Sequence, residues 1–317
     1  MSTILILRDL SKELENKIKQ ALPNWTVILS KEKSDWEPHL KDAEIIGGWH
    51  RDLPSMLEQA PNLTWIQTWS AGVDSLPLDD LDRRGITVTS ANGVHAYPIS
   101  ETIVGMMLSL TRKLHVYGRQ QEQKEWHHAN LGMEMHEKTV AIVGLGAIGK
   151  ETAKLCKAFS MKTIGVKRTV TDVDYVDEVL PFDDLMNKLP ECDYVINTLP
   201  HTKQTEALFS KQVFEKMKES SYFINIGRGE TVDEEAMVDA LRNKKIAGAG
   251  LDVFQEEPLK KESDLWELDN VIITPHTSGS TDVYYTRLVD SIFVPNLEAY
   301  VKDQKPTINV VDVKNGY

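Results

Sequence analysis

The chain has 317 residues, a length that suggests two domains rather than one. Its 48 acidic and 36 basic residues give a net charge of −12, which disfavours nucleic acid and anionic membranes as partners. No apolar run approaches the ~20 residues of a membrane span, and the N-terminal stretch lacks the cationic start of a signal peptide. Cys156 and Cys192 fit no metal-ligand spacing. We therefore expect buried thiols in a cytoplasmic protein and no metal site.

Short strands and helices alternate over the first hundred residues. Apolar, β-branched runs predict strands at 4–7, 26–29, 44–48, 64–68 and 86–89. Amphipathic spacing predicts helices at 12–21, 54–60 and 78–84 between them. Five strands alternating with helices indicate a small parallel α/β domain.

A long helix is expected next, over 100–125, with Ser100 as its N-cap. Its first half, around Ile103–Leu110, is apolar nearly all round. A helix of this kind needs burial on several sides, so we expect it to pack against a second subunit in a homodimer.

The chain is organised around a glycine motif that follows. The apolar run 139–143 predicts a buried strand, and 150–159 has helical spacing. Between them lie Gly144, Gly146 and Gly149 in the pattern G-x-G-x-x-G, with Ala147 and Ile148 inside it. Strand, glycines and helix in this order predict a dinucleotide site in which a pyrophosphate meets the free N–H groups of the helix N-terminus.

A second alternation continues from this motif. Strands are expected at 163–166, 194–197, 222–225, 247–251 and 271–274, with a helix at 233–242. A last helix is expected over 281–302, and the tail 307–313 is expected to return to the first domain. The sequence thus predicts two doubly wound parallel-sheet domains, with a Rossmann cofactor domain at 100–283 inserted in a flavodoxin-like substrate domain at 1–99 and 284–317. Two crossings at one hinge would suit closure over a substrate.

The choice of dinucleotide depends on the residues after the second strand of this alternation. An acid there typically binds the ribose hydroxyl of NAD, whereas a cation suits the 2′-phosphate of NADP. Here the strand is followed by Lys167, Arg168 and Thr169, with no acid. A solvated basic pair is the alternative, but the position favours NADPH.

Three later strand ends carry residues suited to catalysis. Arg228 stands between glycines and is suited to hold a substrate carboxylate through paired hydrogen bonds. Glu257 and His276 follow the next two strands, and a carboxylate beside an imidazole favours its protonated form. Each has an ordinary structural alternative: a surface cation, an acidic turn and a core histidine. Together, after a dinucleotide motif, they predict proton transfer to a carbonyl oxygen during hydride transfer.

These motifs identify a resemblance. VGLGAIG, NIGRG around Arg228, GLDVFQEEP around Glu257 and PHTSG around His276 resemble the D-isomer-specific 2-hydroxyacid dehydrogenases, over nearly the whole chain. The resemblance implies that Arg228 binds the substrate carboxylate and carbonyl and that Glu257 keeps the histidine protonated. It also implies that His276 donates or accepts the proton and that Asp252 faces the nicotinamide carboxamide.

The resemblance also implies further contacts. In the first domain, the backbone amides of Ser70, Ala71, Gly72 and Val73 would bind the substrate carboxylate, together with Arg228 and His276. The other implied cofactor contacts are Thr198, Leu199, Pro200, Thr205, Ile226, Gly227, Ser278 and Gly279. The aromatic residues Trp49, Trp69, Tyr97 and Trp126 are candidates for the acyl pocket, although core packing is the commoner role.

The sequence therefore predicts an NADPH-dependent enzyme that reduces a 2-ketoacid to a D-2-hydroxy acid, similar to the glyoxylate/hydroxypyruvate reductases of the family. Two alternatives stay open. One is a dinucleotide-sensing binding protein on the same fold, similar to the family's transcriptional corepressors. The other is NAD-dependent oxidation of a D-2-hydroxy acid. The side chain of the ketoacid is not predicted.

Overall fold

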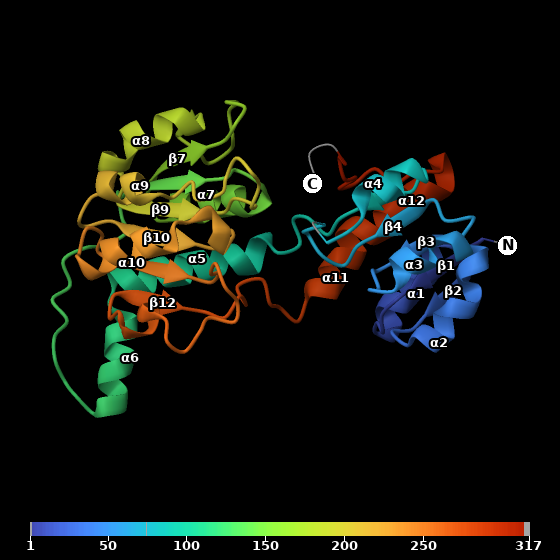
Figure 1. Cartoon of the computed structure of the whole chain (residues 1–317), viewed down its shortest axis with the longest axis horizontal. Coiled ribbons are helices and arrows are strands. Elements are labelled where there is room, and N and C mark those ends of the chain that lie inside the picture. Colours follow the sequence, from blue (N-terminus) through green and yellow to red (C-terminus); the bar gives the residue numbers. More distant parts are fainter. Residues whose placement is uncertain (1, 74, 314–317) are drawn as a thin grey trace. The chain divides into compact units, whose positions relative to one another are not determined.

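The structure is a computed structural model that describes residues 2–73 and 75–313. The chain divides into two compact units: unit 1 comprises residues 1–95 and 281–317, and unit 2 comprises residues 96–280. Each unit is a parallel sheet with helices on both faces (Figure 1). The predicted fold class, two doubly wound parallel-sheet domains, is confirmed. In the described part of the chain, no helix combines the length and apolar character that crossing a membrane requires.

The sheet of unit 1 has the order β2-β1-β3-β4-β5, which is the flavodoxin-like order. Its strands are β1 (Thr3–Ile6), β2 (Thr26–Leu29), β3 (Ala43–Gly47), β4 (Trp65–Gln67) and β5 (Thr87–Thr89). Alternate residues of β1 enter separate cores on the two faces, because successive side chains of a strand point to opposite sides. One face packs α1 (Lys12–Ala21), α11 (Tyr284–Leu288) and α12 (Val294–Asp303). The other packs α2 (Lys33–Trp36), α3 (Leu53–Met56) and α4 (Leu78–Arg83).

The sheet of unit 2 has the order β12-β11-β10-β9-β6-β7-β8. Its strands are β6 (Thr139–Val143), β7 (Lys162–Val166), β8 (Glu178–Leu180), β9 (Tyr194–Asn197), β10 (Tyr222–Asn225), β11 (Gly248–Leu251) and β12 (Val271–Ile273). One face packs α5 (Ala96–Thr111) and α7 (Ala147–Ala158), and the other packs α8 (Leu185–Lys188), α9 (Lys211–Lys216) and α10 (Glu234–Arg242). The chain reverses direction of travel across the sheet between β6 and β9. Open α/β sheets bind ligands at this switch point, beyond the carboxyl ends of the strands.

The prediction of a single helix over 100–125 is wrong. The structure has two helices, α5 and α6 (Leu114–Gln123), separated at Lys113. Lys113 adopts a left-handed backbone (φ 57°), and its Nζ lies 5.8 Å from the ring centroid of Tyr222. The hydroxyl oxygens of Thr111 and Tyr194 lie 2.5 Å apart and are hydrogen-bonded. Contacts with two strands therefore end the helix where helical spacing alone would continue it. Ser100 is not an N-cap but lies inside α5, where its Oγ donates to the carbonyl of Tyr97 at 2.9 Å.

The apolar first half of α5 is largely covered within unit 2. Ile103, Met106, Met107 and Leu110 are buried in the core that α5 shares with α7. By contrast, α6 has no buried residue and projects from the body of unit 2 (Figure 1). The apolar pattern of α5 is thus explained within one chain.

The last helix also departs from the regular form that was expected. It begins at Tyr284, passes through a π-helical turn at Val289–Phe293 and continues as α12. Pro295 lies in the first turn of α12 and has no N–H to donate, so the ladder is interrupted at this point. The tail returns to unit 1 as expected: the N–H of Val311 donates to the carbonyl of Val88 at 2.9 Å.

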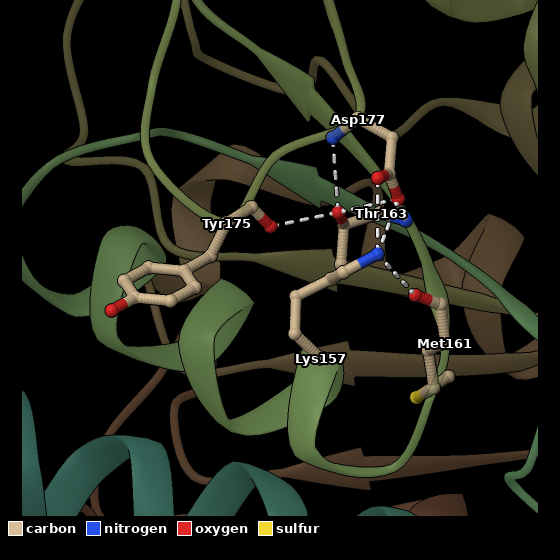
Figure 2. A network of polar contacts seen from close by, with 5 residues as sticks. All are labelled: Lys157, Met161, Thr163, Tyr175 and Asp177. Carbon is tan, nitrogen blue, oxygen red and sulfur yellow. Dashed lines mark hydrogen bonds and ion pairs between the residues drawn. The ribbon is translucent and has the colours of Figure 1, made fainter.

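Residues 167–177 connect β7 to β8, a short strand that the sequence pattern does not predict. A polar network holds the far end of this connection (Figure 2). Asp177 accepts the N–H of Thr163 at 2.8 Å and the Nζ of Lys157 at 3.0 Å, and the hydroxyl of Thr163 donates to the carbonyl of Tyr175 at 2.8 Å. The network joins α7, β7 and the connection. It holds the pKa of Asp177 below its usual value, chiefly through the Thr163 N–H.

Candidate active site

The three glycines of the motif have three different reasons to be glycine. Gly144 directly follows β6 and has φ 105°, a conformation that side chains disfavour. A Cβ on Gly149 would overlap the carbonyl oxygen of Gly144, so only glycine lets α7 approach the strand end. A Cβ on Gly146 would meet no atom within 4 Å, which leaves open space beside the backbone.

The open space lies at the N-terminus of α7, for which Gly146 is the N-cap. The N–H groups of Gly146, Ala147 and Ile148 have no acceptor among the described residues. Unsatisfied N–H groups and the positive end of the helix dipole attract anions. The site therefore fits the pyrophosphate of a dinucleotide.

The predicted ribose-phosphate residues stand where β7 ends, next to β6 in the sheet. Lys167 continues the pairing with β8, since its N–H donates to the carbonyl of Leu180, and its Nζ lies 3.1 Å from the hydroxyl of Thr171. Arg168 and Thr169 are exposed. Residues 167–169, which directly follow the strand, include no acid. This arrangement presents cations at the edge where the second ribose of a dinucleotide is bound.

A buried amide network, missed by the sequence analysis, holds the ends of β9 and β10. Asn197 Nδ2 donates to Asn225 Oδ1 at 2.9 Å and to the hydroxyl of Thr231 at 2.7 Å. Thr231 Oγ1 in turn donates to the carbonyl of Arg228 at 2.6 Å. Both asparagines end apolar strands and are paired in register. A polar residue at the same place in two neighbouring buried strands is the signal that would have revealed them.

This network fixes the loop that carries Arg228. The Arg228 side chain is half-buried, and its Nη1 donates to the carbonyl of Gly227 at 2.8 Å, which leaves its other N–H groups available. A Cβ on Gly229 would overlap the backbone of Phe254, so the Arg228 loop lies directly against the turn that leads to Glu257.

Glu257 and His276 meet directly. His276 Nδ1 lies 2.7 Å from Glu257 Oε2, while Glu257 Oε1 accepts the N–H of Phe254 at 3.0 Å. The pair is accessible: the His276 side chain is 51% exposed and that of Glu257 35%. Because Nδ1 is engaged, Nε2 is the ring nitrogen that remains for a substrate.

The loop of His276 is held by Asp252, which is fully buried at the end of β11. Asp252 Oδ1 accepts the hydroxyl of Thr274 at 2.5 Å and the N–H of Thr277 at 2.9 Å, and Oδ2 accepts the N–H of Ser278 at 3.1 Å. His276 itself has a left-handed backbone (φ 51°). The carboxylate of Asp252 thus has three donors within the protein and positions the histidine loop, a role that the sequence analysis did not assign to it.

The other predicted cofactor residues surround the same strand ends of unit 2. Thr198 Oγ1 donates to the carbonyl of Gly144 at 2.7 Å, and Thr205 Oγ1 to that of Pro200 at 2.7 Å. Leu199 and Ile226 are buried, Gly227 packs against Leu199, and Ser278 is buried beside Gly279. No group of three or more His, Cys, Asp or Glu side chains suited to a metal is found in the described ranges.

The predicted carboxylate loop lies in unit 1, directly after β4. Its shape is set by hydrogen bonds of Ser70, whose Oγ donates to the carbonyl of Gly72 at 2.7 Å and whose carbonyl accepts the N–H of Ala91 at 2.9 Å. The N–H groups of Ala71 and Gly72 find no acceptor among the residues that the structure describes. Val73 is buried and anchors the loop in the core of unit 1.

Comparisons with known proteins agree with this arrangement. Residues 104–278 match the family model of the D-isomer specific 2-hydroxyacid dehydrogenase NAD binding domain. The chain is also 35% identical over 295 residues to a glyoxylate reductase of Thermofilum pendens, covering 88% of this chain and 86% of the relative. The chain belongs to the D-isomer-specific 2-hydroxyacid dehydrogenase family. The resemblance inferred from the sequence motifs is confirmed. The prediction that the chain is an NAD(P)-dependent oxidoreductase is confirmed as well.

Solved structures of the family superpose over the whole chain. A D-isomer specific 2-hydroxyacid dehydrogenase family protein of Aeromonas salmonicida is 34% identical, with a TM-score of 0.85 and coverage of 98% of this chain and 99% of that one. An NADPH-dependent glyoxylate/hydroxypyruvate reductase of Sinorhizobium meliloti, in complex with NADP and sulfate, is 27% identical, with a TM-score of 0.79 and full coverage of both chains. Both domains of the family are therefore present here.

Proposed function

We propose that this dehydrogenase reduces a 2-ketoacid to a D-2-hydroxy acid with NADPH, and that His276 is the general acid. The observation that carries the proposal is the 2.7 Å contact between His276 Nδ1 and Glu257 Oε2. The carboxylate binds Nδ1 and orients the ring, so that Nε2 of the protonated imidazole presents its proton to the substrate. The glyoxylate and hydroxypyruvate reductases among the relatives support this direction of reaction.

The chain's residues divide the work as follows. The N–H groups of Ala71 and Gly72 bind the substrate carboxylate, and unit 1 is thus the substrate domain. Arg228 binds the carboxylate and the carbonyl oxygen through its unused N–H groups and withdraws charge from the carbonyl. His276 Nε2 gives its proton to the carbonyl oxygen and is reprotonated from solvent, to which its side chain is exposed.

Unit 2 is the cofactor domain in this proposal. The N-terminus of α7 holds the pyrophosphate, and Thr198, Leu199, Pro200 and Thr205 line the loop beside it. Asp252, Ser278 and Gly279 lie nearest the nicotinamide. A reduced nicotinamide bound there supplies the hydride that the keto carbon receives. Lys167, Arg168 and Thr169 bind the 2′-phosphate, which makes NADPH the preferred cofactor over NADH.

A panel of 2-ketoacids, read by the loss of NADPH absorbance, tests the function. We expect turnover of at least one of glyoxylate, hydroxypyruvate and the longer 2-ketoacids, with the D-isomer as product. NADPH binding without reduction of any ketoacid would contradict the proposal and favour a sensing role.

The cofactor preference has a separate test. Arg168→Ala should lower kcat/KM with NADPH by about 10- to 100-fold, the range of a lost hydrogen bond between charged groups, and leave the value with NADH within about twofold. Asp174→Ala, on the same connection, is the matched control and should change neither. A wild-type kcat/KM with NADH equal to or above that with NADPH would contradict the preference.

We further infer a homodimer of a cytoplasmic protein. Because α5 is buried within its own unit, support for the dimer comes instead from apolar side chains beyond it. Leu114 is 53% exposed and Trp126 is 95% exposed, on α6 and on the irregular segment after it. Exposed apolar side chains at both ends of α6 favour an interface along this helix. Light scattering on Trp126→Ser beside the wild type tests the dimer: a monomeric wild type would refute it.

The cytoplasmic location rests on two buried free thiols, Cys156 and Cys192. Localisation of the tagged protein tests it.

A further inference from the structure

Arg8 follows β1 at the carboxyl edge of the sheet of unit 1, the same edge that carries the loop 70–73. Its side chain is half-buried, and its guanidinium lies 4.7 Å from the ring centroid of Tyr285. In the described part of the chain, Arg8 makes no hydrogen bond and no ion pair. A guanidinium has five N–H donors, and partly buried cations normally have an anionic partner.

The first acids after Arg8 and after Tyr285 in the sequence, Asp9 and Asp290, are both paired with lysines. Asp9, the next residue, lies 3.7 Å from Lys31 Nζ and also accepts the Lys31 N–H at 3.3 Å. Asp290 lies 2.9 Å from Lys17 Nζ. The stacking on Tyr285 holds the guanidinium in place, and its N–H donors stay unused.

Aromatic side chains connect Arg8 to the loop that binds the substrate carboxylate. Tyr285 packs edge-on against Trp69, with ring centroids 6.2 Å apart. The Trp69 ring leans from the end of β4 over the end of β3, so that a Cβ on Gly48 would lie 2.7 Å from Trp69 Nε1 and 3.2 Å from Leu7 Cβ. The indole thus covers the strand end that separates the loop 70–73 from Arg8.

The distance between β1 and β4 sets the size of a ligand that contacts both Arg8 and the loop 70–73. β1 and β4 are separated by β3, so their backbones lie about 10 Å apart at two strand spacings. The Arg8 side chain covers part of this distance. Tyr284 lies beside the same strand end, since its hydroxyl donates to the carbonyl of Trp69 at 2.6 Å. A 2-ketoacid with its first carboxylate on the loop therefore needs several further bonds before a second group meets Arg8.

We propose that Arg8 recognises a second anionic group on the side chain of the substrate, and that the enzyme prefers 2-ketoacids that end in a carboxylate. A planar guanidinium matches a carboxylate through two parallel hydrogen bonds, and the Trp69 ring provides an apolar surface for the methylene groups between the two ends. Arg8 is a specificity residue and takes no part in the proton transfer. The inference rests on the ketoacid reductase function proposed above.

The test compares 2-oxoglutarate with 2-oxopentanoate, which has the same chain length and no second carboxylate. We expect wild-type kcat/KM to be at least about tenfold higher for 2-oxoglutarate, mainly through KM, as one charge-assisted pair provides. Arg8→Met keeps the apolar stem on Tyr285 and should abolish that preference while leaving 2-oxopentanoate within about twofold. Arg8→Lys keeps the charge without the paired geometry and should retain part of it. Arg83→Met, which removes an exposed arginine of unit 1 paired with Asp80, is the control and should change neither substrate.

The outcomes separate this inference from the proposed function. Equal wild-type kcat/KM for the two acids, or an unchanged preference in Arg8→Met, refutes the role of Arg8 while ketoacid reduction stands. Reduction of no ketoacid refutes both. A second arm of the test compares phosphohydroxypyruvate with hydroxypyruvate. A wild-type preference for phosphohydroxypyruvate that Arg8→Met loses, with no preference for 2-oxoglutarate, would assign Arg8 to a phosphate group and refute the terminal carboxylate. NADPH KM and thermal unfolding temperature, expected to match the wild type, show that each variant is folded.

Discussion

Replacing Glu257 by Gln tests how much the Glu257–His276 pair contributes to catalysis. The substitution keeps the size of the side chain and an oxygen that can accept the Phe254 N–H, but it removes the charge 2.7 Å from His276 Nδ1. A hydrogen bond to a charged group contributes about 1.5–3 kcal/mol. At about 1.4 kcal/mol for each factor of ten, kcat should fall roughly 10- to 150-fold. This loss does not exceed the factor of about 10²–10⁴ that acid catalysis supplies in total.

The assay is the steady-state loss of NADPH absorbance with the best ketoacid. Glu256→Gln is a matched control, because Glu256 is the neighbouring acid and pairs with Lys260 at 2.6 Å on the surface. A kcat of Glu257→Gln within twofold of the wild type would refute the reasoning.

Three further substitutions probe the cofactor domain. Gly149→Ala should lower the free energy of unfolding by about 1–3 kcal/mol, because the added Cβ would overlap the Gly144 carbonyl. Gly146→Ala should leave the unfolding temperature unchanged and raise the KM for NADPH. Equal behaviour of the two variants in thermal melts and kinetics would contradict these roles of the two glycines. Asp177→Asn should lower the free energy of unfolding at neutral pH by about 0.5–1 kcal/mol, since the group is partly exposed. The folded-state pKa of Asp177 is lowered, so its stabilisation is present above the unfolded pKa of about 3.9 and is lost as pH falls through the folded value. Urea unfolding from pH 7 to pH 3 should therefore show the two proteins converging in acid, and a constant difference would contradict this account.

Buried parallel strands were predictable because their residues are apolar on both faces. The runs at Tyr194–Asn197 and Tyr222–Asn225 coincide with β9 and β10, and the other predicted strands agree within one or two residues. β8 was missed because Glu178–Leu180 is short and begins with an acid. The break at Lys113 was missed because two tyrosines from distant strands cause it, and helical spacing does not record them.

The same distinction applies to the site. The strand ends that carry Arg228, Glu257 and His276 follow from the motifs, because carboxyl ends of parallel strands share one edge. The contacts that hold these three residues in place do not follow from the motifs. The hydrogen bonds of Asn197 and Asn225, and the three donors around Asp252, depend on the register between strands and on loop conformations such as the left-handed His276. These are properties of the folded chain that no local pattern expresses.

The role of His276 as the proton donor is the central claim, and His276→Ala tests it most directly when turnover and NADPH binding are measured on the same preparation. Loss of a general acid should lower kcat by about 10²–10⁴. The Kd for NADPH, measured by its fluorescence on binding, should stay within about threefold. A His276→Ala enzyme with wild-type kcat would contradict the account, and so would one whose activity is lost only because NADPH no longer binds.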